Sequence, residues 1–148
     1  MSIAFETDPQ RATYERVATL LRDEFGKQAS PHSERPVFML RTGSAMTQVH
    51  VDRIGDKASV VRALSWVVTG AEQSAELHKF LLEANLSVRF GAFAVDQAGD
   101  IAFTHAILGE GLTTDALMFT VVGVAQIADE YDDLIVQRFG GQRASDRG

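Results

Sequence analysis

The segment from Thr113 to Gly141 constrains the fold more than any other part of this chain, because its residues repeat with the period of an α-helix. Thr113 or Thr114 can cap its start, and Asp115 places a carboxylate in the first turn, where it complements the helix dipole. Gly140 and Gly141 supply a left-handed end. About 26 residues at 1.5 Å rise per residue predict a rod of roughly 39 Å, enough to cross a small domain.

One apolar stripe runs along this helix and predicts that the helix lies on a core. The stripe consists of Leu117, Val121, Val124, Ala128, Tyr131 and Ile135. In the first half, Met118, Phe119 and Val122 widen the apolar surface, so that part needs cover on two sides. Gly123 costs the helix about 1 kcal/mol relative to Ala, which favours close packing at that point. We predict a helix docked on a sheet, with its first half also touching another element or another subunit.

The remainder of the chain predicts two more helices and five strands. The first helix begins at Asp8-Pro9, with Asp8 as its cap, and the second ends at Asn85 in the left-handed conformation. Alternating and β-branched residues predict strands over 37–41, 46–54, 59–68, 88–96 and 101–108. Segment 27–35 is expected to be a loop and 142–148 a frayed tail. The order α-βββ-α-ββ-α predicts a single α+β domain over residues 1–141, an antiparallel five-stranded sheet with helices packed on it.

Composition narrows the class of function. The chain has 148 residues, 45% of them hydrophobic, so it can bury a core of its own without a metal or a disulfide. It has no cysteine, which excludes thiol catalysis and cysteine-based zinc sites and fits a reducing cytoplasm. A formal net charge of -6 argues against nucleic acid and anionic membranes as partners. Without a signal peptide or a membrane-spanning window, the sequence predicts a cytoplasmic protein.

No motif for catalysis or cofactor binding is found, and the prediction is a non-enzymatic protein without cofactor or metal. Gly109-Glu110-Gly111 resembles only a fragment of a phosphate loop. His50, Asp52 and His105 would make a two-histidine, one-carboxylate metal site if they converged, but packing or surface positions are the simpler interpretation. The acidic run 129–133 is interpreted as a solvated helix face, since its carboxylates point in different directions.

Four residues are candidates for a protein interface. Met118, Phe119 and Val122 lie outside the main stripe of the last helix, and Trp66 is the one tryptophan of the chain. Large aromatic side chains concentrate binding energy at interfaces. The alternative is burial in the core, which the apolar strand around Trp66 favours for that residue.

Five short motifs follow one another in the C-terminal half of the chain. They are 77–85 (LHKFLLEAN), 88–93 (VRFGAF), 99–101 (GDI), 128–132 (ADEYD) and 139–141 (FGG). Together they resemble the YbjN-like proteins, a family grouped with the fold of type III secretion chaperones. The resemblance covers residues 70 to 141 and implies helix, three strands, helix, two strands and helix, a homodimer and a non-enzymatic role. Secretion chaperones of that fold bind an extended segment of an effector along their surface.

Three hypotheses for function follow. The first is a dimeric protein-binding module, chaperone-like or adaptor-like, that buries apolar patches and pairs a partner strand with a free sheet edge. The second is a small-ligand-binding regulatory domain with a pocket between the sheet and the last helix. The third is a metal-dependent enzyme built on His50, Asp52 and His105.

Overall fold

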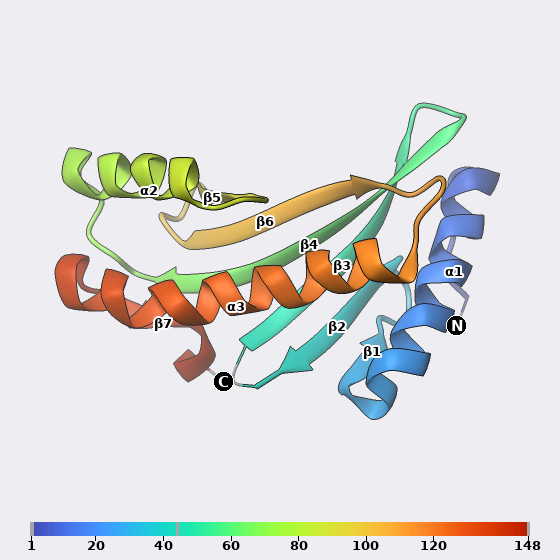
Figure 1. Ribbon diagram of the computed structural model, residues 1–148, viewed down its shortest axis with the longest axis horizontal. Helices are drawn as coiled ribbons and strands as arrows, with labels where there is room; N and C mark the ends of the chain where they lie inside the picture. Colours follow the sequence, from blue (N-terminus) through green and yellow to red (C-terminus); the bar gives the residue numbers. More distant parts are fainter. Residues whose placement is uncertain (1, 44, 148) are drawn as a thin grey trace.

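The computed structural model describes residues 2–43 and 45–147 (Figure 1). The α-helices are α1 (Asp8–Phe25), α2 (Ala75–Ser87) and α3 (Thr114–Phe139), and short 3-10 helices are η1 (Gly26–Gln28) and η2 (Ala144–Arg147). The strands are β1 (Ala29–Pro31), β2 (Val37–Thr42), β3 (Ala45–Ile54), β4 (Ala58–Thr69), β5 (Ala92–Val95), β6 (Ile101–Leu108) and β7 (Gln142–Arg143).

The strands form one antiparallel sheet in the order β1-β2-β3-β4-β6-β5, and β7 pairs with the end of β4. Helices α1 and α3 cross one face of this sheet, and α2 lies beside β5 at its edge (Figure 1). The expected α+β architecture is confirmed, including the long helix docked on an antiparallel sheet.

The core lies between α3 and the middle strands. Leu117, Val121 and Ile135 of the α3 stripe are fully buried, and so are Val61 of β4 and Val49 of β3 on the facing side of the sheet. The side chains of successive strand residues alternate between the two faces, so each central strand gives every second residue to this core. The helical period of the sequence therefore identified the correct face of α3.

Over the described residues the sheet has seven strands, so the expected number of five is wrong. The two additional strands, β1 and β7, lie in the segments expected to be a loop and a frayed tail. β1 pairs with β2 along three residues, and β7 places Arg143 opposite Val68. Segments of two or three residues show no measurable alternation, because their pairing depends on the neighbouring strand rather than on a sequence pattern.

Two helix ends also differ from expectation. The N-cap of α1 is Thr7, whose Oγ1 accepts the N–H of Gln10 at 3.2 Å, so Asp8 is the first helical residue rather than the cap. α2 continues to Ser87, two residues past Asn85. No described residue other than glycine has a positive φ, so Asn85 does not adopt the left-handed conformation.

Asn85 instead joins α2 to β5. Its Oδ1 accepts the backbone N–H of Phe93 at 2.7 Å, and its Nδ2 lies 3.5 Å from the carbonyl oxygen of Phe93. β5 begins only at Ala92, because Gly91 turns the chain with φ +84°. A Cβ on Gly91 would lie 2.7 Å from the carbonyl oxygen of Thr104, so the close approach of this turn to β6 requires glycine.

A polar cluster joins α1 to the sheet and to the loop before α3. The hydroxyls of Thr13 and Ser59 lie 2.6 Å apart, and the Glu110 carboxylate accepts both the N–H and the O–H of Ser59 at 2.7 Å. A Cβ on Gly109 would overlap with the Ser59 hydroxyl. Gly109 and Glu110 therefore have a structural role, in close packing and in hydrogen bonding at Ser59.

Replacing Asn85 with alanine should lower the free energy of unfolding by about 1–2 kcal/mol, because the N–H of Phe93 loses its acceptor. Urea unfolding followed by circular dichroism measures the change. Asn85→Asp is the matched control, since it keeps the acceptor oxygen, and it should lose less. Equal losses in the two variants would contradict the role of that hydrogen bond.

Candidate functional site

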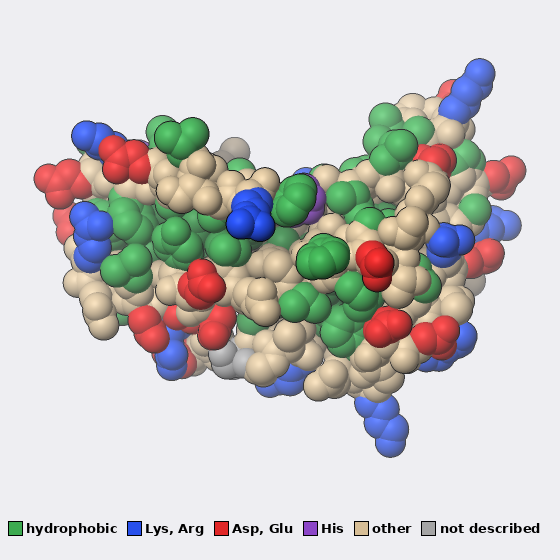
Figure 2. Space-filling model, viewed as in Figure 1, with side chains coloured by type: hydrophobic (Ala, Val, Ile, Leu, Met, Phe, Trp, Pro, Cys, Tyr) green, Lys and Arg blue, Asp and Glu red, His purple; other side chains and the backbone are tan. Residues whose placement is uncertain are grey.

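An apolar groove runs between α3 and the free side of β6. Its two adjoining hollows have volumes of about 200 Å³ and 340 Å³ and share Phe90, His105, Phe119 and Thr120. Phe119 is 78% exposed and Phe90 68% exposed, which is unusual for two large apolar side chains lining one hollow. Figure 2 shows the upper outline of the molecule hollowed in this region, with hydrophobic side chains around a histidine.

Half of β6 has no partner strand on the side of the groove. β5 pairs with β6 only from Ile101 to Thr104, whereas β4 pairs with β6 along its whole length on the other side. Among the described residues, no strand covers residues 105–108 on that outer side. The groove therefore borders an open sheet edge.

Residues from three separate segments form the groove. His105 and Ile107 pair with Ala63 and Val61, so their side chains lie on the helix face of the sheet. The ring of Phe90 lies 5.5 Å from the ring of His105. Burial lowers the pKa of His105, which favours the neutral imidazole in this apolar setting.

The predicted interface residues divide between different surfaces. Phe119 lines the groove. Met118 packs partly against the core, and Val122 is half-buried. Trp66 is half-buried and alternates with the buried residues Ser65 and Val67, so it lies on the sheet face away from the helices. The structure thus brings Phe119 to the groove and separates it from Trp66.

Within the described part of this chain, Gly123 does not pack closely against another element, so the close packing expected at this position has no partner inside the chain. A Cβ on Gly123 would meet no atom within 4 Å, and the residue lines the smaller hollow of the groove. The glycine reduces helix stability without a packing reason inside this chain.

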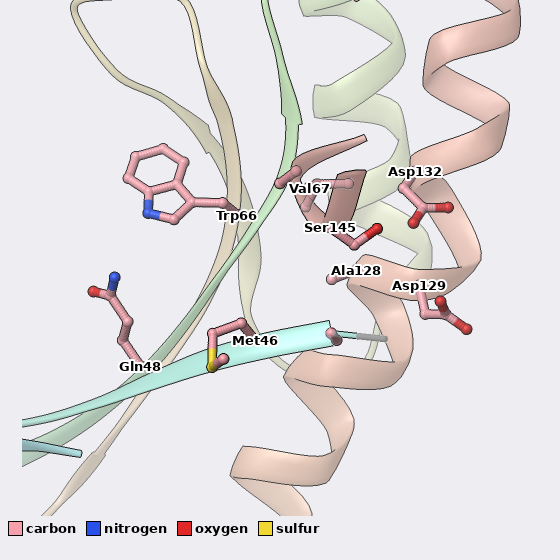
Figure 3. A pocket seen from close by; sticks show the side chains of 10 residues that line it. Met46, Gln48, Trp66, Val67, Ala128, Asp129, Asp132 and Ser145 are labelled. Atoms are coloured by element: carbon pink, nitrogen blue, oxygen red, sulfur yellow. The ribbon is translucent and has the colours of Figure 1, made fainter. Parts of the chain in front are cut away.

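A second cavity of about 220 Å³ lies between the ends of β3 and β4, α3 and the C-terminal segment. Trp66 and Gln48 lie on one side of the strands, while Asp129 and Asp132 lie on the α3 side (Figure 3). Their polar groups do not converge on one point. The cavity is smaller than the roughly 300–1,000 Å³ of typical small-molecule pockets.

The three residues of the metal hypothesis do not meet, and that hypothesis is wrong. His50 pairs with Arg62, whereas His105 pairs with Ala63, the next residue of β4. Successive residues point to opposite faces, so the two histidines lie on opposite sides of the sheet. His50 Nε2 contacts Gln48 Oε1 at 3.0 Å instead. The described part of the chain holds no group of three potential metal ligands.

The comparison with protein families matches residues 12–147 to the model described as "T3SS (YopN, CesT) and YbjN peptide-binding chaperone 1". The chain belongs to this family. The resemblance to YbjN-like proteins is thereby confirmed, and the match extends it into the N-terminal half.

The fold agrees with that of a solved chain in the "Crystal Structure of the ExsC-ExsE Complex". The TM-score is 0.61 at 16% sequence identity, over 82% of this chain and 95% of that chain. At this identity the likeness shows a shared fold. The search of curated proteins found no match.

The sequence alone did not place Phe90 or Ile107 in a surface groove, and it indicated His105 only as a metal ligand. Phe90 was assigned to a strand, although β5 begins only at Ala92. Two further exposed residues, Leu82 and Leu86, are 70% and 90% exposed on α2. The two leucines are four residues apart and lie away from the buried side of α2. This spacing indicates a second apolar surface and can be recognised in the sequence.

Within residues 2–43 and 45–147, no helix combines the length and apolarity needed to cross a bilayer.

Asp132 departs from the expected solvated acidic face, since it is only 6% exposed. Burial raises the pKa of its carboxyl, and the charges of Asp133 and Asp129 act in the same direction. The N–H of Asp133, which donates to Asp132 Oδ1 at 2.6 Å, and the charge of Arg143 oppose the rise in pKa. The folded chain therefore holds the proton more tightly than the unfolded chain.

Wild-type stability should fall relative to Asp132→Asn as the pH rises from about 3.9, the usual pKa of an aspartate, through the higher folded pKa. Above the folded pKa the carboxyl of Asp132 is ionised in both states, and its destabilising effect has reached its full size. The asparagine variant, which has no such charge, should therefore be more stable at neutral pH. Urea unfolding between acidic and neutral pH measures the difference, with the exposed Glu24→Gln as control. A difference that does not change with pH would contradict the burial argument.

Proposed function

We propose that this chain binds an extended peptide segment of a partner protein in the groove between α3 and β6, as a chaperone or adaptor without catalysis. The observation that carries the proposal is the open half of β6 beside an apolar groove. Membership of a peptide-binding chaperone family supports the same kind of partner. We expect it to act in the cytoplasm.

The segment would add to the sheet as a further strand. The N–H of Gly109 donates to the carbonyl oxygen of Ser59 at 2.8 Å, so odd-numbered residues at this end of β6 direct their backbone groups toward β4. Ala106 and Leu108 accordingly direct theirs toward the open side. A peptide paired there would have a regular series of backbone hydrogen bonds and would place alternate side chains over the groove.

Apolar burial would supply most of the affinity. Phe90 and Phe119 expose most of their side chains, and covering such a side chain contributes about 1.5–3 kcal/mol. Backbone pairing fixes the direction and register of the segment, whereas the groove selects its side chains.

The small-ligand alternative has less support. The cavity beside Trp66 is small and its polar groups face different ways, whereas ligand pockets direct a few polar groups toward one point. The two hollows of the groove form an elongated apolar surface along a strand edge, which suits a peptide better than a compact molecule.

We also propose a homodimer formed by the outer face of α2. Leu82 and Leu86 are exposed one turn apart, and neither lines the groove. An apolar ridge on a helix can pack against its symmetry copy in an isologous interface. The groove would then stay free for a peptide in each copy.

A display library of random 12-residue peptides tests the binding proposal. Immobilised wild-type protein should enrich peptides with alternating large apolar residues, and Phe119→Asp should weaken their binding tenfold or more, because a charge replaces the exposed ring. Ala12→Asp, which adds the same charge on an exposed part of α1, is the control and should bind normally. Fluorescence anisotropy with the synthetic peptide measures the affinities.

Two outcomes would refute this groove as the binding site. One is that no peptide is enriched on the wild type. The other is that Phe119→Asp binds the enriched peptide as the wild type does. Amide exchange is an independent readout, since a bound strand should slow exchange at Ala106 and Leu108.

The dimer proposal predicts that Leu82→Asp combined with Leu86→Asp gives a folded monomer of about 16.1 kDa, half the wild-type mass in solution. Light scattering measures the mass and circular dichroism verifies the fold. Phe119→Asp combined with Val122→Asp should remain dimeric. A monomeric wild type would exclude the homodimer, and dissociation of only the second double variant would place the interface on α3.

A further inference from the structure

We propose that Gly123 forms the floor of a pocket that accepts one large apolar side chain of the bound peptide. This inference rests on the proposed function and assigns a specificity-determining residue within it. Gly123 lies in the interior of the 26-residue helix α3, where glycine is less favourable than any common residue except proline.

No contact in the described part of the chain explains this glycine. Unlike Gly91 and Gly141, it does not have a positive φ, and a Cβ built on it meets no atom within 4 Å. A Cβ built on Gly91 or on Gly141 would lie 2.7 Å from a backbone atom, so their lack of a side chain is a packing requirement. At Gly123 the same lack leaves open space.

That open space has the size and lining of a side-chain pocket. The hollow measures about 200 Å³, and Val88, Val124 and Ile127 give it apolar walls. Phe90 and Phe119 line both this hollow and the larger one, which also includes Ile107 of β6. An apolar cavity of about 150 Å³ is enough to hold a benzene ring, so this hollow can hold an aromatic or large aliphatic side chain.

Three exposed polar side chains also line the hollow. Arg89, Gln126 and Glu130 line it together with the apolar residues. An apolar interior with polar groups around it is the arrangement that anchors one side chain and leaves the adjoining backbone hydrated. The preferred ligand is therefore an extended segment with a Phe, Leu, Ile or Met at one position and polar neighbours.

Gly123→Leu tests the inference, because its side chain would fill the hollow and leucine is a good helix former. The variant should melt at or above the wild-type temperature and bind the enriched 12-residue peptide at least tenfold more weakly. Gln137→Leu is the matched control, since it adds the same side chain at an exposed position of α3 outside the groove. It should bind as the wild type does.

A peptide whose large apolar residue is replaced by Ala completes a double-mutant cycle. If that residue occupies the hollow, Gly123→Leu should weaken binding of the alanine peptide much less than binding of the parent peptide. If Gly123→Leu binds the peptide as the wild type does while Phe119→Asp does not bind it, the pocket at Gly123 is wrong and the proposed function still stands. Binding unaffected by both substitutions would overturn both proposals. A Gly123→Ala variant less stable than the wild type would show that the space is not open.

Discussion

The packing of the α3 stripe on the sheet is the contact on which the rest of the structure depends. Leu117, Val121 and Ile135 are fully buried, and a large-to-small change at such a position costs about 2–5 kcal/mol. α2 and β5 reach the core through the same helix, since Tyr131 stacks edge-on against Phe80 and Phe93. The second half of α3 thus packs against the sheet, α2 and β5. In its first half, residues outside the buried stripe, such as Phe119, line the groove.

The motifs that resemble the YbjN-like family explain the fold rather than a chemical activity. Asn85 ties α2 to β5, Gly91 permits the turn against β6, and Tyr131 packs between two aromatic rings. A Cβ on Gly141 would lie 2.7 Å from the carbonyl oxygen of Thr69, so the glycine allows the chain to return along β4. These motif residues hold the elements of the fold together. They therefore indicate the family and its fold, but they do not indicate which partner the chain binds.

The secondary structure of long periodic segments could be predicted from the sequence. The tertiary contacts between separate segments could not. The repeat from Leu117 to Ile135 defines both the length and the buried face of α3. The groove depends on Phe90 approaching Phe119, which follows from the turn at Gly91 and has no sequence period. Likewise, alternation along one strand places His50 and Asp52 together but does not give the register that separates them from His105.

The edge strand β1 and the open half of β6 differ in a way that favours a partner at β6. Exposed edges are normally short, charged or interrupted by proline, because an apolar edge recruits other strands. β1 follows that rule with three residues ending in Pro31, whereas residues 105–108 read His-Ala-Ile-Leu without charge or proline. Beside this edge, Gly123 weakens α3 without a packing reason. The uncharged open half of β6 reduces solubility, and Gly123 reduces the stability of α3. The two features are adjacent, and no contact within the described chain explains them. Such local costs are expected at functional sites, which supports a binding site for another chain here.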